Sequence, residues 1–245
     1  MFTENELQTI KKIYPGLKHI TDKRKNFLRG NLHFRACYNK DIKEFIINPS
    51  ENITVADTYI DDGFEIEIEF LQGFPKQFPL VREVGGRIQQ IVEKYSLQDV
   101  VDLHINKSQD NAACFCPKPA EKLRYPDKIN LIHFINNLVV PFFYGLSFYE
   151  KHGLWPWDEY SHGNLGIFEF YAENKGKKDL SIAKSCYECL DEQGKKIIMS
   201  NKRIKGHWPC ICGSKEKFRK CHKLVLEGIW ALKNDIKEEN LAKGE

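Results

Sequence analysis

Three cysteines and one histidine near the C-terminus have the spacing of a metal site. Cys210 and Cys212 stand two residues apart beside Gly213, and Cys221 and His222 follow as neighbours. Two thiols on a tight glycine turn, met by a Cys-His pair that opens a helix, supply four ligands for a tetrahedral zinc ion. Because protein side chains fill all four positions, the sequence predicts a structural Zn²⁺ site with no open position for a substrate.

Residues 207–222, led by Trp208 and Pro209, resemble the SEC-C zinc motif found at the tail of the bacterial secretion motor and on many unrelated bacterial proteins. The resemblance implies a zinc site and a docking role, with no activity of its own. A module this short is expected to gain its fold from metal binding. Its basic residues could touch phosphates, but we expect solvated charges and no nucleic-acid partner. These basic residues are Lys215, Lys217, Arg219 and Lys220.

A loop in the middle of the chain carries a candidate nucleophile. His104 and Asn106 precede Cys114 by ten and eight residues, and Cys116 follows two residues later. An accessible thiolate can attack an activated acyl carbon and later leave easily, which is the chemistry of a thioester carrier. The loop follows the proline-rich turn of residues 74–79.

This arrangement resembles the core of ubiquitin-conjugating enzymes: a helix, an antiparallel meander, an aromatic-proline turn, a His-x-Asn motif and a cysteine ten residues after the histidine. The resemblance covers residues 3–171. Residues 153–163 are similar to the bacterial branch of that family, found among antiphage signalling genes. The resemblance implies a thioester on Cys114, a hydrogen bond from Asn106 to the oxyanion that forms during transfer, and a bracing role for His104.

Three positions depart from the family's pattern. Ile105 replaces a proline, Asn111 stands where glycine is usual, and Cys116 adds a second thiol. Cys116 could be the nucleophile, a redox partner or inert, and the ten-residue spacing favours Cys114. The structural alternative is that Cys114 is a small buried residue on an inactive scaffold.

A tryptophan-rich segment supplies a further polar group. Asp158, Glu159 and His162 lie in sequence beside Trp155 and Trp157. If this segment folds over Cys114, an acidic residue or His162 could orient or deprotonate the incoming amine, so His162 is a catalytic candidate. The alternative is that the tryptophans cover the core and the polar residues satisfy loop backbone groups.

Hydrophobic spacing predicts the elements that position these residues. Thr3 and Glu6 are spaced as a capping box for a first helix that ends at Pro15. Apolar and polar residues alternate over 32–38 and 64–70, which indicates strands with one wet face.

The segment from residue 80 to about 127 has the pattern of irregular structure, and residues 129–149 that of a long helix kinked at Pro141. The order predicts an α+β fold, a ubiquitin-conjugating-enzyme-like antiparallel meander with flanking helices.

The predicted domains follow a change of charge. Residues 1–171 contain 20 basic and 23 acidic side chains, whereas residues 172–245 contain 17 and 11. We predict a ubiquitin-conjugating-enzyme-like domain over residues 1–171, a linker and helix over 172–199, and a SEC-C-like zinc module with a C-terminal helix over 200–245.

Composition sets limits on the class of protein. The 245 residues are 42% hydrophobic and 29% charged, a composition that excludes a disordered chain. The net charge of +3 is too small to indicate a kind of partner. We find no secretory signal pattern and no apolar run of spanning length, so we expect a cytoplasmic protein that does not enter a membrane. Eight cysteines in a reducing compartment indicate ligands, a nucleophile or core residues. Cys186 and Cys189 are a further candidate ligand pair, and their spacing on a helix face favours plain thiols over ligands.

Three functions fit the sequence. The favoured one is an acyl carrier transferase, in which another protein activates the passenger because the chain has no adenylating domain. The resemblance implies that the passenger is a ubiquitin-like protein or the C-terminus of a cyclic-nucleotide synthase. The alternatives are a non-catalytic zinc-containing interaction protein and a cysteine protease that pairs Cys114 with a distant histidine such as His162.

Overall fold

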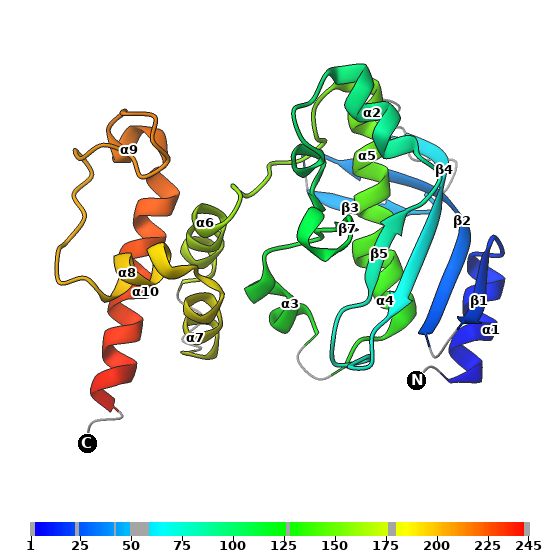
Figure 1. The fold of residues 1–245 in the computed structure, drawn as a ribbon, viewed down its shortest axis with the longest axis horizontal. Helices are drawn as coiled ribbons and strands as arrows, with labels where there is room; N and C mark the ends of the chain where they lie inside the picture. Colours follow the sequence, from blue (N-terminus) through cyan, green and yellow to red (C-terminus); the bar gives the residue numbers. More distant parts are fainter. Residues whose placement is uncertain are drawn as a thin grey trace. The chain divides into compact units, whose positions relative to one another are not determined.

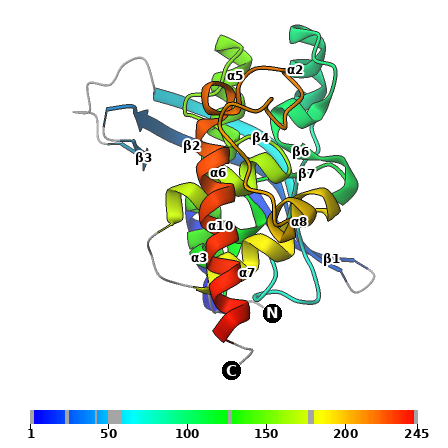
Figure 2. The same ribbon diagram turned by 90° about the vertical axis from the view of Figure 1, so that its left-hand side faces the viewer.

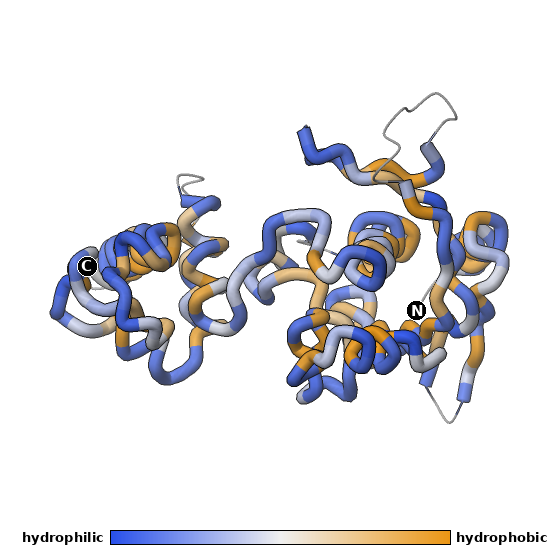
Figure 3. The backbone as a smooth tube through the Cα atoms, turned by 90° about the horizontal axis from the view of Figure 1, so that it is seen from above, coloured by the Kyte–Doolittle hydropathy of each residue, from blue (hydrophilic) through white to orange (hydrophobic). Residues whose placement is uncertain are grey.

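The computed structural model describes residues 3–22, 25–41, 43–49, 59–125, 128–175 and 180–242, and Figure 1 shows how they fold. The chain forms two compact units. The first contains residues 1–115 and 127–158, and the second contains residues 116–126 and 159–245. Figure 3 shows hydrophobic residues interleaved with hydrophilic ones along both units, as expected where each unit buries a core of its own.

An antiparallel sheet is the centre of the first unit, which confirms the predicted α+β class. Its strands are β1 (Leu17–Asp22), β2 (Lys25–Asn39), β3 (Glu44–Ile47), β4 (Tyr59–Phe70) and β5 (Leu80–Glu83). Their order is β1-β2-β4-β5, with β3 beside the far end of β2. In β4 the apolar residues Phe64, Ile66 and Ile68 are buried while Glu65 between them is exposed. The alternation seen in the sequence is therefore the division between core and solvent.

Two helical regions flank this sheet. The first is α1 (Glu4–Ile13), and its start is the predicted capping box: the Thr3 hydroxyl accepts from the Glu6 amide at 3.3 Å, and the Thr3 amide donates to the Glu6 carboxylate at 2.9 Å. The second is a helical run made of α4 (Leu131–Phe134), the π-helix η4 (Ile135–Val139) and α5 (Val140–His152). Figure 1 shows α5 lying along the face of the sheet.

Pro141 changes the helix type in this run. Proline lacks an amide hydrogen, and its ring clashes with the carbonyl four residues earlier, so a regular α-helix cannot pass through it. The wider turns of η4 directly before Pro141 provide the space, as π-helical turns do elsewhere. The predicted helix is therefore present, and a π-helical segment ends two residues before the proline.

The same helical run is apolar enough to be compared with a membrane span. Residues 131–152 pass the test of length and composition for crossing a membrane, contrary to the expectation that no stretch approaches it. Polar residues interrupt its apolar residues, so a search for one continuous apolar run does not detect this helix. However, 72% of its most apolar window is buried inside the protein. Such burial is typical of the core helix of a soluble protein.

The segment from residue 80 to 127 is more regular than predicted. It contains β5, the helix α2 (Arg87–Tyr95), the 3₁₀ turns η2 (Val100–Leu103) and η3 (Lys107–Gln109), the short strands β6 (Ile105–Asn106) and β7 (Ala112–Ala113), and α3 (Lys118–Arg124). The helix α2 buries only Ile91 fully, so its apolar pattern is too sparse to predict it. Its tertiary contacts stabilise it.

The main tertiary contact of α2 is an ionic network at its first residue. The Arg87 guanidinium donates to both carboxylate oxygens of Asp62 on β4, at 2.9 and 2.7 Å, and to Glu150 on α5. The Ser147 hydroxyl donates to Asp62 at 2.6 Å. Burial alone would raise the pKa of Asp62, but the hydrogen bonds from Arg87, Ser147 and the Gly63 amide outweigh it and lower the pKa below its ordinary value.

Replacement of Asp62 by asparagine tests the strength of this network. We expect Asp62→Asn to lower the free energy of unfolding by about 2 kcal/mol at pH 7, because charge-assisted hydrogen bonds are lost from a site that is 21% exposed. A carboxylate with a lowered folded pKa stabilises above its unfolded pKa, and that contribution disappears as the pH falls through the folded pKa.

Urea unfolding of the wild type and Asp62→Asn from pH 7 to pH 2 measures this effect. The difference between the two proteins should be largest at neutral pH and shrink below about pH 4. A difference that does not change with pH would show that Asp62 contributes through packing alone.

The second unit is helical. It contains α3, α6 (Asn164–Asn174), α7 (Leu180–Cys189), α8 (Glu192–Met199), α9 (Phe218–Cys221) and α10 (Lys223–Ala242). Figure 2 shows α10 running beside α6 and α7. At Gly228 of α10 an added Cβ would lie 1.9 Å from the Phe168 carbonyl oxygen of α6, so glycine is required for this close approach.

The segments of the second unit share one core, which differs from the predicted domain organisation. Phe168 of α6, Ile182 of α7, Ile198 of α8, Phe218 of α9 and Ile229 of α10 all belong to it. The predicted boundary after residue 171 lies inside α6. Residues 180–199, expected to lie in a linker and helix, form α7 and α8, whose apolar side chains contribute to the core. The polar residues that suggested a linker include 176–179, which lie outside the described part of the chain.

Candidate functional site

The short ladder between β6 and β7 positions the candidate nucleophile. Ile105 pairs with Ala113, and Asn106 pairs with Ala112. The Cys114 amide continues the ladder by donating to the His104 carbonyl at 2.7 Å. Because side chains alternate along a strand and paired residues share a face, this register directs Asn106 and Cys114 to the same face.

Cys114 is exposed, in contrast to the structural alternative of a buried, inert residue. It follows directly after β7, so its backbone is held by the ladder while its side chain can meet solvent. A reagent or an activated acyl group can therefore reach the thiol.

The Asn106 amide group is oriented by a local turn. Its carbonyl oxygen accepts from the Ser108 amide at 3.1 Å and from the Ser108 hydroxyl at 2.7 Å, capping η3. The oxygen is thereby occupied, which leaves the NH₂ end as the donor. Asparagine two residues before serine is a common turn pattern, so the sequence holds a signal for this interaction that is separate from the His-x-Asn spacing.

His104 lies at the start of the ladder, with φ of +55°, and is half-buried. Its ring meets the buried Trp155 edge-on, with centroids 5.2 Å apart at 65°. The tryptophan-rich segment thus covers the core beside the loop, as one of the two interpretations of that segment expects. These contacts suit the bracing role that the resemblance implies.

Two further residues shape the loop between Asn106 and Cys114. Arg82 of β5 donates from Nε to the Asp110 carbonyl at 3.0 Å and from Nη1 to Glu69 at 2.9 Å, which ties the loop to the sheet. Asn111 has φ of +56°. This is the left-handed region that glycine adopts freely and asparagine tolerates, so the departure from glycine at position 111 preserves the turn.

Two other proposed residues of this site, Cys116 and His162, lie in the second unit. Cys116 is partly buried against the helical core of that unit, so it is less accessible than Cys114. His162 is exposed on the turn before α6 and is not part of the β6–β7 ladder. Of the neighbouring acidic residues, Asp158 is exposed in the first unit and lies 3.9 Å from the ammonium of Lys43.

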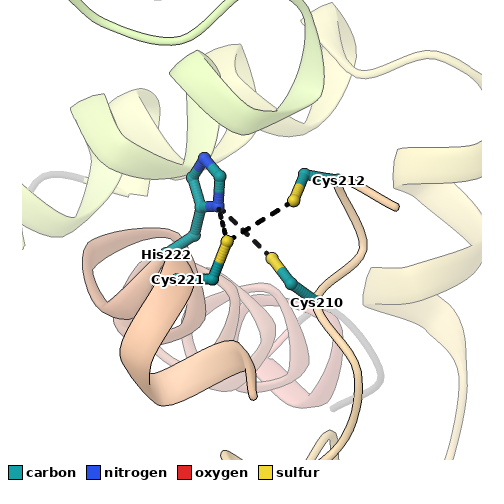
Figure 4. A group of neighbouring side chains, drawn as sticks. All are labelled: Cys210, Cys212, Cys221 and His222. Atoms are coloured by element: carbon teal, nitrogen blue, oxygen red, sulfur yellow. Dashed lines mark hydrogen bonds between the residues drawn. The ribbon is translucent and has the colours of Figure 1, made fainter. Parts of the chain in front are cut away.

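The four predicted metal ligands form a separate cluster in the second unit. Their ligand atoms all lie within 4.8 Å of one another, and Figure 4 shows them converging on one point. The sulfurs of Cys212 and Cys221 are 3.6 Å apart, and His222 Nδ1 is 3.3 Å from the sulfur of Cys210 and 3.1 Å from that of Cys221. Ligands about 2.3 Å from a tetrahedral zinc ion would be separated by about 3.8 Å. These residues can therefore hold a metal ion, and three sulfurs with one imidazole suit zinc.

Backbone hydrogen bonds preform this cluster. The Cys210 amide donates to the Glu216 carbonyl at 2.8 Å, and Pro209 forms a bridge with Lys217. Gly213 closes the turn with φ of +87°. Cys210 is buried, and burial raises its pKa to about 11, whereas hydrogen bonds from Ser214 lower the pKa of the exposed Cys212 to about 6.

The remaining cysteine pair lies on α7. Cys186 is fully buried, and this burial, with Cys189 as a smaller cause, raises its pKa to about 12. A thiol with this pKa stays protonated at neutral pH and is a poor nucleophile. This agrees with the interpretation of Cys186 as a plain thiol, while that of Cys189 stays a prediction.

Comparison of the chain with protein-family models, with curated proteins and with solved structures finds no match.

Proposed function

We propose that this chain is a cysteine acyl carrier of the ubiquitin-conjugating type, with a structural zinc site in its second unit. The proposal is supported mainly by one observation: an exposed Cys114 and an Asn106 whose oxygen is already occupied share one face of the β6–β7 ladder. An accessible thiol beside an oriented amide donor is the minimum that such a carrier requires.

The chemistry has two steps. In the first, the Cys114 thiolate attacks the carbonyl carbon of an activated passenger C-terminus; a C–S bond forms, and the activating group leaves with its electron pair. In the second, an amine attacks the same carbon; the C–N bond forms, the C–S bond breaks, the thiolate leaves, and the amine proton passes to solvent. The Asn106 NH₂ group donates to the carbonyl oxygen while it carries negative charge.

The passenger is proposed from the resemblance alone. It is a ubiquitin-like protein or the C-terminus of a cyclic-nucleotide synthase from an antiphage operon, charged by a separate activating enzyme. The zinc site, by contrast, would be structural: four protein side chains would bind the ion, and the site has no part in the transfer.

The proposal is tested by isolating the full chain from its host without reducing agent and measuring its intact mass. A carrier would show a fraction increased by the mass of the whole passenger protein less one water, and treatment with excess thiol would remove that increase. A non-catalytic interaction protein would co-purify its partner with no covalent increase. A chain that instead hydrolyses peptide substrates alone would be a protease.

Asn106 has a specific expected effect on the second step. Asn106→Asp keeps an oxygen for Ser108 but removes the NH₂ donor, so we expect discharge of the Cys114 thioester to slow by about 10²- to 10³-fold. The thioester is prepared by exchange with a synthetic peptide thioester, and its loss to free lysine is followed by mass spectrometry. Charging should proceed at the wild-type rate.

Ser108→Ala is the matched control for Asn106→Asp. It removes one hydrogen bond to the Asn106 oxygen and keeps the donor, so its discharge rate should lie much closer to that of the wild type. Equal slowing in both variants would mean that Asn106 supports the shape of the loop and gives no direct help to the transfer.

A further inference from the structure

An unneutralised basic surface surrounds the metal cluster of the second unit. Glu216 is the only acidic residue between positions 200 and 224. Eight basic residues there are exposed. Lys223 pairs with Glu227 at 3.8 Å and Arg203 contacts the Trp230 ring; the other six are Lys202, Lys205, Lys215, Lys217, Arg219 and Lys220. Within the described part of the chain, none of these six forms an ion pair. Their charges therefore add to one local positive potential, despite the small net charge of the whole chain.

The backbone of the metal loop brings these charges together from two strips of sequence. The Arg219 amide donates to the Gly206 carbonyl at 2.9 Å, and the Phe218 amide donates to the Trp208 carbonyl at 2.8 Å. The strip of residues 205–209 consequently lies against the strip of residues 217–219. Arg219 is thus paired with Gly206, beside Lys205, and Lys217 with Pro209 at the other end of the pairing, and the metal ligands at the ends of both strips hold this arrangement.

An aromatic residue on the same loop as these charges is partly exposed. Trp208 is 38% exposed, although tryptophan is highly buried on average. By comparison, Trp230 donates from its ring nitrogen to the Ile204 carbonyl at 2.9 Å and lies 5.4 Å from the Arg203 guanidinium. Trp230 therefore has a structural role in holding this segment, whereas Trp208, on the same loop as Lys205 and Lys217, is partly accessible to solvent.

Cations bordering an exposed aromatic ring match the chemistry of a single-stranded nucleic acid. Phosphates neutralise the cations, and a base without a pairing partner can stack on the ring. A duplex hides its base faces, and an acidic peptide has no planar group for the ring. An anionic membrane would be held more firmly by several apolar side chains than by one tryptophan.

We propose that the metal loop of the second unit binds single-stranded nucleic acid, with phosphates along Lys205, Lys217, Arg219 and Lys220 and one base stacked on Trp208. The expectation of merely solvated charges did not take account of the exposed ring. This interaction is independent of Cys114 and would add a binding activity to the acyl carrier.

The binding test uses the full zinc-loaded chain and fluorescein-labelled dT12 and rU12, measured by anisotropy. Both strands should bind, with the logarithm of affinity falling with log[salt] by about 0.7 for each phosphate neutralised. Lys217→Glu with Lys220→Glu should weaken binding at least about tenfold. Lys11→Glu with Lys12→Glu, on α1 of the first unit, is the matched control and should bind as the wild type does. The ratio of the two affinities shows whether RNA or DNA is preferred.

Stacking is tested separately from charge. Trp208→Ala should weaken oligonucleotide binding by about fivefold or more, since a stacked base contributes about 1–3 kcal/mol. The same variant should keep its affinity for inorganic polyphosphate, which has phosphates and no bases. Trp208→Phe retains a ring and should lose less than Trp208→Ala.

Several results would overturn this proposal. They are absence of binding to both strands at 50 mM salt, equal weakening in the Lys11/Lys12 control, and an equal loss of polyphosphate binding in Trp208→Ala. Preferential binding to phosphatidylglycerol vesicles over both strands would replace it with a membrane-surface role. Zinc content and circular dichroism of each variant show that the metal loop is intact.

Discussion

Cys114→Ser is expected to convert a thiol-labile adduct into one that excess thiol does not remove, and Cys114→Ala to abolish the adduct completely. Serine forms an oxygen ester, which resists thiol exchange, whereas alanine has no nucleophile. Because Cys114 is exposed and its backbone is held by the ladder, neither substitution should disturb the fold. This is the largest expected effect on activity.

The measurement is intact mass before and after thiol treatment, with the adduct located by peptide mapping. Cys116→Ala is the matched control, because Cys116 is two residues from Cys114 and is partly buried. It should keep the adduct. If Cys116→Ala removes the adduct and Cys114→Ala retains it, the nucleophile is Cys116. The β6–β7 ladder would then not position the reacting thiol.

Removal of zinc is expected to have the largest effect on stability. Structural zinc sites contribute about 10–16 kcal/mol in small zinc-binding peptides, which is comparable to the whole stability of a typical domain. Cys210 and Phe218, at the two sides of the metal loop, also belong to the core shared by α6, α7, α8 and α10. We therefore expect metal loss to destabilise the second unit as a whole, beyond the metal loop itself.

Hydrogen exchange with and without a chelator measures this at neutral pH. Amides of residues 205–222 should lose protection first, followed by α10, while β2 and β4 of the first unit keep theirs. Cys212→Ser should reproduce the effect without chelator, since Cys212 is exposed and contributes little packing. Cys114→Ala should leave zinc content and exchange unchanged. Full protection after confirmed metal loss would show that the helical core needs no metal.

Local patterns were the best guides to this chain. The capping box at Thr3, the alternation along β4 and the long apolar helix could all be predicted, because each depends on residues a few positions apart. The helix α2 could not, since Arg87 holds it through Asp62 and Glu150, 25 and 63 residues away. The shared core of the second unit was missed for the same reason: it joins residues 116–126 to the chain after residue 159.

The sequence by itself determined the metal ligands, because Cys-x-Cys and Cys-His place sulfur and imidazole within reach whenever the turn between them closes. It also named Cys114 as the candidate nucleophile. Three features became visible only in the folded chain: Cys114 is exposed, Ser108 occupies the Asn106 oxygen, and Trp208 is 38% exposed. The physical reason is that the identity of a side chain sets which bonds it can form. Solvent access and hydrogen-bond partners, in contrast, depend on which distant segments pack around it.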